Sequence, residues 1–416
     1  MTHPFRALRH RDFALFVLGQ GAGILGYWIQ QLAVHWLMYR LTGSAFLLGV
    51  TVFAAQIPVL VLGPIAGALA DRVDRHRAFS VVQALQLLQA FVMAALAFLG
   101  IIEPWHMIAL ALFLGMTIAV ELPVRHAYLP DLLGAREDLP NAVAVTSFVA
   151  SAGRLVGPSV AGIVIAAFSE ATCFLLNGFS YFIVLATLAA IRRKPSTHRA
   201  EPRPMLSDLR EGALYAWHAR PIRILLIVLA VVSFMATPYQ PLMPAFVREA
   251  YAGGPETLGF LVAAAGLGAL IGTGVLSARG STRGLTSLIA LSTTCAGLAL
   301  AAFSVTRWYP LSLLLMAVTG FGILATTVSV SMILQTLVED RVRGRVMSLY
   351  TAAFLGVAPL GGFVAGAAAD AIGAATTIGI GGVCCALTGL ALARMRRRFA
   401  AEAGAARAER RGASLI

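Results

Sequence analysis

Apolar runs of about 20 residues follow one another along the whole chain, each long enough for a helix to cross a bilayer. A helix satisfies its own backbone hydrogen bonds in lipid, and none of the runs carries a strand signal. We therefore expect twelve membrane-spanning helices. Their centres lie near Gly26, Ile57, Gln89, Gly115, Val156, Phe182, Phe234, Gly266, Thr293, Gly320, Gly356 and Gly382.

Composition supports the same class. Of the 416 residues, 59% are hydrophobic and 12% are charged, and that charged fraction is about half that of a soluble domain. All four cysteines fall within apolar runs and show no metal-ligand spacing, so we predict neither a disulfide framework nor a metal site. The predicted fold class is an all-α membrane protein.

The placement of positive charge predicts the topology, because loops rich in Lys and Arg stay in the cytoplasm. With the N-terminus inside, 28 of the 32 Lys and Arg residues fall in cytoplasmic segments. Arg40, Arg248 and Arg307 fall outside, and Arg154 lies within a span. We expect a multi-pass protein of the plasma (inner) membrane with both termini cytoplasmic. This distribution of the +13 net charge favours membrane lipids, and not nucleic acid, as partners.

A long hydrophilic stretch with four prolines, residues 192–221, divides the chain into related halves. We expect an N-terminal six-helix bundle at 1–191, a cytoplasmic linker at 192–221, a C-terminal six-helix bundle at 222–394 and a basic cytoplasmic tail at 395–416. Two pseudo-symmetric halves with a substrate site between them at the midplane are the plan of many secondary transporters.

One charged hinge interrupts the apolar pattern between the second and third spans. Its spacing, Gly-x-x-x-Asp-Arg-x-x-Arg-x-Arg, resembles a loop of major facilitator superfamily transporters. The resemblance implies that Asp71 meets the positive N-terminus of the eleventh helix and closes the cytoplasmic side, while the arginines bind headgroups and nearby acids. Asp74 stands where the family usually has glycine. The predicted gate consists of Gly67, Asp71, Arg72, Arg75 and Arg77.

A second motif lies in the fifth span, where glycines recur near a Gly-Pro step. It resembles the helix 5 motif of proton-coupled exporters in the same superfamily. Glycines let a neighbouring backbone approach closely, and proline bends a helix by removing a hydrogen bond. The alternative is generic packing of small residues. The predicted elbow consists of Gly153, Gly157, Pro158 and Gly162.

Few ionisable residues lie within the spans. Arg154 is about 13 residues, or roughly 20 Å, into the fifth span, where a charge normally faces a partner or a wet cavity. Glu121, near the inner end of the fourth span, is the acid within reach of Arg154 or Arg72. Arg154 is thus either half of a structural ion pair or part of a proton or substrate site. With Asp71, Arg154 and Glu121 are the coupling candidates.

Polar residues at three- and four-residue steps form matching stripes on the first and seventh spans. Such a stripe avoids lipid, so it faces either water or other protein. Pro238 and Pro241 are expected to kink the seventh span. The substrate-cavity candidates are Gln20, Trp28, Gln31, Ser233, Thr237 and Gln240.

Segments at 129–142 and 343–348 resemble the superfamily branch of the enterobactin exporter and its drug-efflux relatives. This implies export of a small amphipathic organic molecule, siderophore or drug-like, by proton antiport with alternating access, from a monomer without cofactor. Lys194 is the sole lysine, so no Walker A sequence exists, and no hydrolase motif is present. We expect no enzyme activity. A lipid or lysolipid flippase, an uncoupled facilitator, and a non-transporting receptor or assembly partner are the alternatives.

Overall fold

A computed structural model of the chain describes residues 6–70, 73–133, 136–191, 215, 217–277, 284–338 and 340–413. Within these ranges the chain is helical and contains no strand. Twelve helical segments are long and apolar enough to cross a membrane, and each contains one of the predicted centres. The predicted twelve-helix membrane fold is therefore confirmed. Most of the predicted linker, residues 192–214 and 216, lies outside the described residues.

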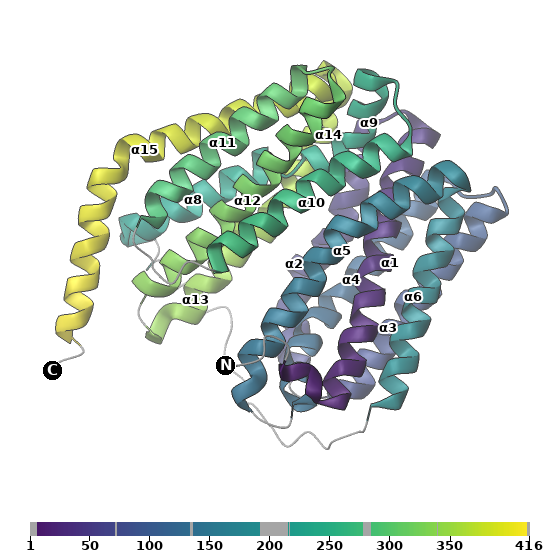
Figure 1. Ribbon diagram of the computed structural model, residues 1–416, viewed down its shortest axis with the longest axis horizontal. Helices are drawn as coiled ribbons and strands as arrows, with labels where there is room; N and C mark the ends of the chain where they lie inside the picture. The colour runs from purple at the N-terminus through teal and green to yellow at the C-terminus, as the bar shows by residue number, and fades with distance from the viewer. Residues whose placement is uncertain are drawn as a thin grey trace. The chain divides into compact units, whose positions relative to one another are not determined.

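The first compact unit holds the first six spans, together with the end of α9 and the start of α10 at Pro244–Ala263. Helix α1 packs against α5 and α6, α2 packs against α4, and α3 packs against α4 and α6 (Figure 1). Its elements are η1 (Arg6–Arg9), α1 (Arg11–Thr42), α2 (Ala45–Ala70), α3 (Arg75–Phe98), α4 (Pro104–Tyr128), η2 (Leu129–Leu132), η3 (Arg136–Asp138), α5 (Leu139–Ala167) and α6 (Glu170–Ala190).

The second unit comprises Arg203–Met243 and Ala264–Ile416. Helix α11 packs against α12 and α15, and α8 packs against α14 and α15. The remaining elements are α8 (Arg220–Met235), α9 (Tyr239–Tyr251), α10 (Pro255–Ser277), α11 (Leu285–Val305), α12 (Tyr309–Leu337), α13 (Asp340–Thr351), η4 (Ala352–Gly356), α14 (Val357–Ile372) and α15 (Ala374–Ala413).

Two spans of the second unit are interrupted. The seventh breaks between α8 and α9, where residues 236–238 form a turn in front of Tyr239. Proline at 238 has no backbone N–H to continue the ladder, so the predicted kink is a complete break. The eleventh span contains η4, a π-helical segment, and such segments are frequent at functional sites. Ser233 connects the two spans, since its hydroxyl donates to the carbonyl of Phe354 in η4.

The glycines of α5 bring two helices close. A Cβ added at Gly153 would lie 2.5 Å from Ile24 Cγ2, and one at Gly157 would lie 2.5 Å from Trp28 Cβ. One added at Gly162 would lie 2.7 Å from the Pro255 carbonyl of α10. Real Cβ atoms do not approach so closely, so only glycine permits this spacing. The small residues of α5 therefore set its distance to α1 on one side and to the start of α10 on the other.

Candidate functional site

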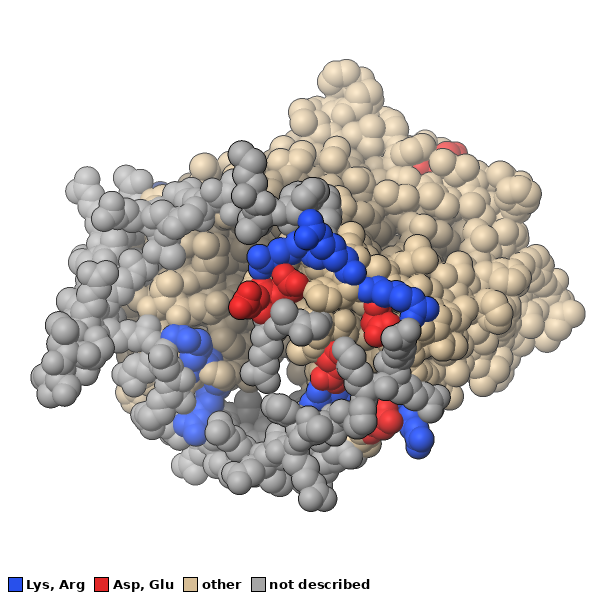
Figure 2. Space-filling view, turned by 60° about the horizontal axis from the view of Figure 1, so that its bottom comes forward, with Lys and Arg blue, Asp and Glu red and all other residues tan. Residues whose placement is uncertain are grey.

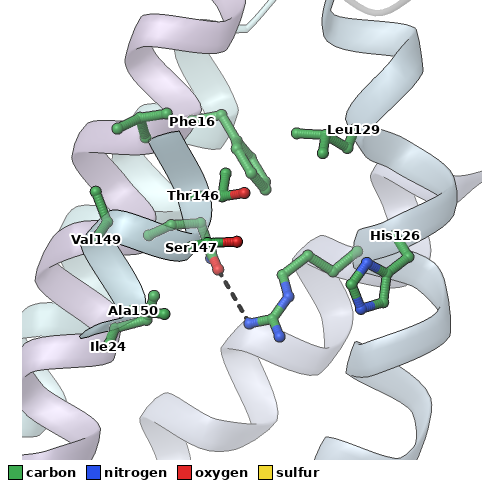
Figure 3. A pocket seen from close by; sticks show the side chains of 11 residues that line it. Phe16, Ile24, His126, Leu129, Thr146, Ser147, Val149 and Ala150 are labelled. Atoms are coloured by element: carbon green, nitrogen blue, oxygen red, sulfur yellow. Dashed lines mark hydrogen bonds between the residues drawn. The ribbon is translucent and has the colours of Figure 1, made fainter. Parts of the chain in front are cut away.

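A pocket of about 220 Å³ opens between α1, α4 and α5 in the first unit. Figure 3 shows His126 and Leu129 on one side, with Thr146 and Ser147 opposite them and Ile24 beside Ala150. The lining is mostly apolar with a few polar groups, as is usual for small-molecule sites. Its residues are Phe16, Val17, Gln20, Ile24, Arg125, His126, Leu129, Thr146, Ser147, Val149 and Ala150.

Gln20, one of the predicted cavity residues, lines this pocket and receives a hydrogen bond from Arg125, drawn as the dashed line in Figure 3. The Arg125 Nη1 atom is 3.5 Å from Gln20 Oε1 and 3.2 Å from Glu121 Oε1. Arg125 sits one helical turn after Glu121 on α4, so the two side chains are neighbours on one helix face. The Arg125 side chain therefore connects Glu121 to the pocket wall.

Glu121 is the coupling candidate that the structure places beside this pocket. Its side chain is 12% exposed, and its second oxygen accepts a hydrogen bond of 2.9 Å from Gln86 Nε2 on α3. Gln86 also donates to Thr117. The ion pair with Arg154 that the sequence left open is not formed among the described residues, because Glu121 points to Arg125 instead.

Arg154 has a different neighbour. Its guanidinium carbon lies 5.1 Å from the centre of the Trp28 ring, close enough for a cation–π contact. Tyr27 meets Trp28 edge to face at 5.7 Å and accepts a hydrogen bond of 3.1 Å from Gln31. Of the predicted cavity residues, Trp28 thus contacts the cation of Arg154, and Gln31 bonds the neighbouring Tyr27.

A separate polar cluster lies on the opposite face of α1 and is structural. Gln30, which is 1% exposed, donates to Gln89 of α3 and accepts a hydrogen bond of 2.8 Å from Asn177 of α6. Ser180 in turn donates to Asn177. These bonds tie three helices together where lipid offers no alternative partners.

The three cavity candidates of the second unit adjoin the break in the seventh span. Ser233 is fully buried, and its hydroxyl donates to the Phe354 carbonyl. Thr237 donates to the Ser233 carbonyl at 2.5 Å, and Gln240 lies 3.5 Å from the Tyr239 hydroxyl. Both are partly exposed.

The charged hinge is described in part. Asp71 and Arg72 lie outside the described residues, and a Cβ added at Gly67 meets nothing within 4 Å among the rest. Arg75 is 12% exposed and bonds Asp131 of η2 at 3.0 Å. Arg77 lies 3.6 Å from Asp74 and is well exposed. Figure 2 shows Lys and Arg side chains (blue) next to Asp and Glu side chains (red) on the face of the molecule that is turned forward there.

Asp74 has a clear local function. Its carboxylate accepts a hydrogen bond of 3.0 Å from the backbone N–H of Arg77, which caps the N-terminus of α3. At the same end, Asp138 pairs with Arg6 at 2.8 Å, and Asn141 accepts from the backbone N–H of Ala7. Asp74, Asp138 and Asn141 therefore stabilise the chain segments at the N-terminal ends of α1, α3 and α5.

Arg125 and Gln30 are site and network residues that the sequence analysis did not single out. Arg125 was grouped with cytoplasmic loop charges, although it lies within the fourth span, Pro104–Leu132. Its spacing of four residues from Glu121 is the signal that identifies the pair. Gln30 lies off the polar stripe of α1.

Several known proteins are similar to this chain over most of its length. A family model described as "Transmembrane secretion effector" matches residues 2–412. The staphyloferrin A transporter of Staphylococcus aureus is 27% identical over 86% of this chain and 90% of its own length. The multidrug efflux pump Tap of Mycolicibacterium fortuitum is 26% identical over 87% and 88%. The enterobactin exporter EntS of Shigella boydii is 28% identical over 91% and 89%.

Among solved structures, the nucleoside transporter NupG aligns with a TM-score of 0.71, at 13% identity, over 91% of this chain and 98% of its own. At that identity the likeness concerns the fold alone. It agrees with the twelve spans described above.

Proposed function

Because this chain belongs to the transmembrane secretion effector family of the major facilitator superfamily, we propose that it exports a small amphipathic organic molecule in exchange for protons. The molecule is siderophore-like or drug-like, in keeping with the enterobactin exporter and the multidrug pump to which the chain is similar. The observation that carries the proposal is the pocket of the first unit with Glu121 beside it.

Glu121 supplies the proton-binding group. As a carboxylate it holds Arg125, which also bonds Gln20, at the pocket wall. Protonation removes the charge that holds Arg125, and the arginine side chain, already bonded to Gln20, turns into the pocket. Arg125 lines the pocket, so its movement further inward takes up volume that the cargo would occupy. Proton and cargo therefore compete, as antiport requires.

Topology and gating follow the charge pattern. Both termini lie in the cytoplasm, the protein sits in the inner membrane as a monomer, and its basic loops attract anionic lipid headgroups. The Arg75–Asp131 pair anchors the hinge, and Asp71 with Arg72 acts as the cytoplasmic gate. The close packing of Gly153, Gly157 and Pro158 keeps α5 stiff while the two halves alternate in access.

The test is transport in proteoliposomes under an imposed pH gradient, with siderophores, organic anions and lipophilic cations as cargo. We expect the gradient to accelerate transport by the natural protein. Glu121→Gln should lose this acceleration by about tenfold or more but keep exchange down a cargo gradient, because an amide takes up no proton near neutral pH. Glu249→Gln, at an exposed carboxylate of α9, is the matched control.

Three outcomes would overturn the proposal. Transport that ignores the gradient would make the protein an uncoupled facilitator. Movement of labelled lysolipid between leaflets, with no transport of soluble cargo, would make it a flippase. Absence of all transport from a correctly folded sample would favour a receptor or assembly partner.

A further inference from the structure

We propose that Arg154 and the Trp28 ring form an anion-binding site, and that the exported molecule is an organic acid whose anionic group binds there. This inference rests on the proposed export function and specifies the chemical class of its cargo. It starts from a charge for which the described part of the chain provides no counter-ion.

Arg154 lies 15 residues after Leu139, the first residue of α5, and so is deep within a membrane span. Its side chain is exposed, and its contact is the face of Trp28 at 5.1 Å. No carboxylate pairs with it in the parts of the chain that the structure describes, and the coupling candidate Glu121 is engaged by Arg125 and Gln86. An uncompensated cation at this depth is costly unless it meets water or an anion.

The pocket faces of two helices lead to this pair. On α5, Ser147 and Ala150 line the pocket, and Arg154 follows at the next helical step of four residues. On α1, Gln20 and Ile24 line the pocket, and Trp28 follows at a further step of four. Residues at such steps share one face of a helix. Arg154 and Trp28 therefore extend the pocket wall towards the middle of the membrane.

The start of α10 packs against α5 one turn beyond Arg154. Pro158, one turn beyond Arg154, has its carbonyl 2.5 Å from where a Cβ on Gly259 would stand. Helix α10 thus covers the face on one side of Arg154, while the pocket adjoins it on the other.

The chemistry of the pair suits an amphipathic acid. A guanidinium stacked on an aromatic ring keeps its edge N–H groups available, and these match the oxygens of a carboxylate or sulfonate in a two-point contact. Trp28 and Tyr27, which meet edge to face at 5.7 Å, provide an apolar surface beside the charge. A neutral molecule of the same shape would keep the apolar contact with the two rings but lose the contact with the guanidinium.

The test compares two probes that share one ring system, 8-anilinonaphthalene-1-sulfonate and uncharged N-phenyl-1-naphthylamine. Equilibrium dialysis against the purified protein in nanodiscs, corrected with empty nanodiscs, gives both affinities. We expect Arg154→Gln to weaken binding of the sulfonate by about tenfold or more and to leave the neutral probe within about twofold. Arg248→Gln is the matched control, because Arg248 lies 5.4 Å over Trp36 outside the pocket.

Arg154→Lys decides the matter if the glutamine variant does not fold. Lysine keeps the charge but not the planar fork, so sulfonate affinity should fall by about threefold or more while neutral-probe affinity holds. Equal losses for both probes, or no loss for the sulfonate, would overturn the proposal. Binding is measured without a gradient, so a failure of proton coupling leaves this result intact. Conversely, if the gradient drives export of cations alone, the proposed export function stands and the proposal of an organic acid as cargo is wrong.

Discussion

Replacing Gly157 by alanine should destabilise the first unit, although alanine is the better helix former. A Cβ at this position would lie 2.5 Å from Trp28 Cβ, 3.3 Å from the Leu25 carbonyl oxygen and 3.4 Å from the Trp28 carbonyl carbon. The position of Trp28 Cβ is fixed by the backbone of α1, and the other two atoms belong to that backbone. A rotamer change therefore cannot relieve the contact. Overpacking of this kind costs about 1–3 kcal/mol, against a helix-propensity gain of about 0.5–1 kcal/mol.

Gly63→Ala isolates the packing cost. Gly63 is also inside a membrane helix, α2, and a Cβ there meets nothing within 4 Å in the described structure. The two variants share the propensity gain, so their difference in unfolding free energy should equal the overpacking cost of about 1–3 kcal/mol. Helical circular dichroism during titration with SDS in mixed micelles measures both. Equal stabilities would refute the claim that Gly157 sets the distance between α1 and α5.

Two further substitutions test the gate and the polar network. Asp71→Asn should reduce transport in the proteoliposome assay by about tenfold or more at normal membrane levels, because the amide cannot carry the charge that the gate requires; full activity would reject the gate. Gln30→Ala should lower the unfolding free energy by about 1–3 kcal/mol, since it removes the bonds to Gln89 and Asn177. Gln335→Ala, at an exposed glutamine bonded within its own helix, should cost less than about 0.5 kcal/mol, and equal losses would contradict the network.

Several site residues could be recognised before the structure because their signals are local. Gln20, Trp28 and Gln31 share a face of α1 by spacing alone, and the structure places Gln20 on the pocket and Trp28 beneath Arg154. Arg154 is identified by its depth within an apolar run. Their positions are as the periodicity indicates, while their roles in transport remain predictions.

Partner choice could not be predicted in the same way. Glu121 had Arg154 and Arg72 as expected partners, yet it binds Arg125 on its own helix and Gln86 on α3. Periodicity identifies the face of a helix but not the helix that packs opposite it. Ser233 lies on the predicted stripe of the seventh span, but its hydroxyl is taken up by the π-helical segment.

Hydropathy and charge alone determined the number of spans and the class of the fold, because the cost of burying charge or open backbone in lipid depends on each segment by itself. Which polar side chains meet depends on how each helix is rotated about its axis, and tertiary packing decides that rotation. An example is α5, where glycines let α1 approach to within contact distance. That contact depends on two segments more than a hundred residues apart in sequence, and no local pattern contains it.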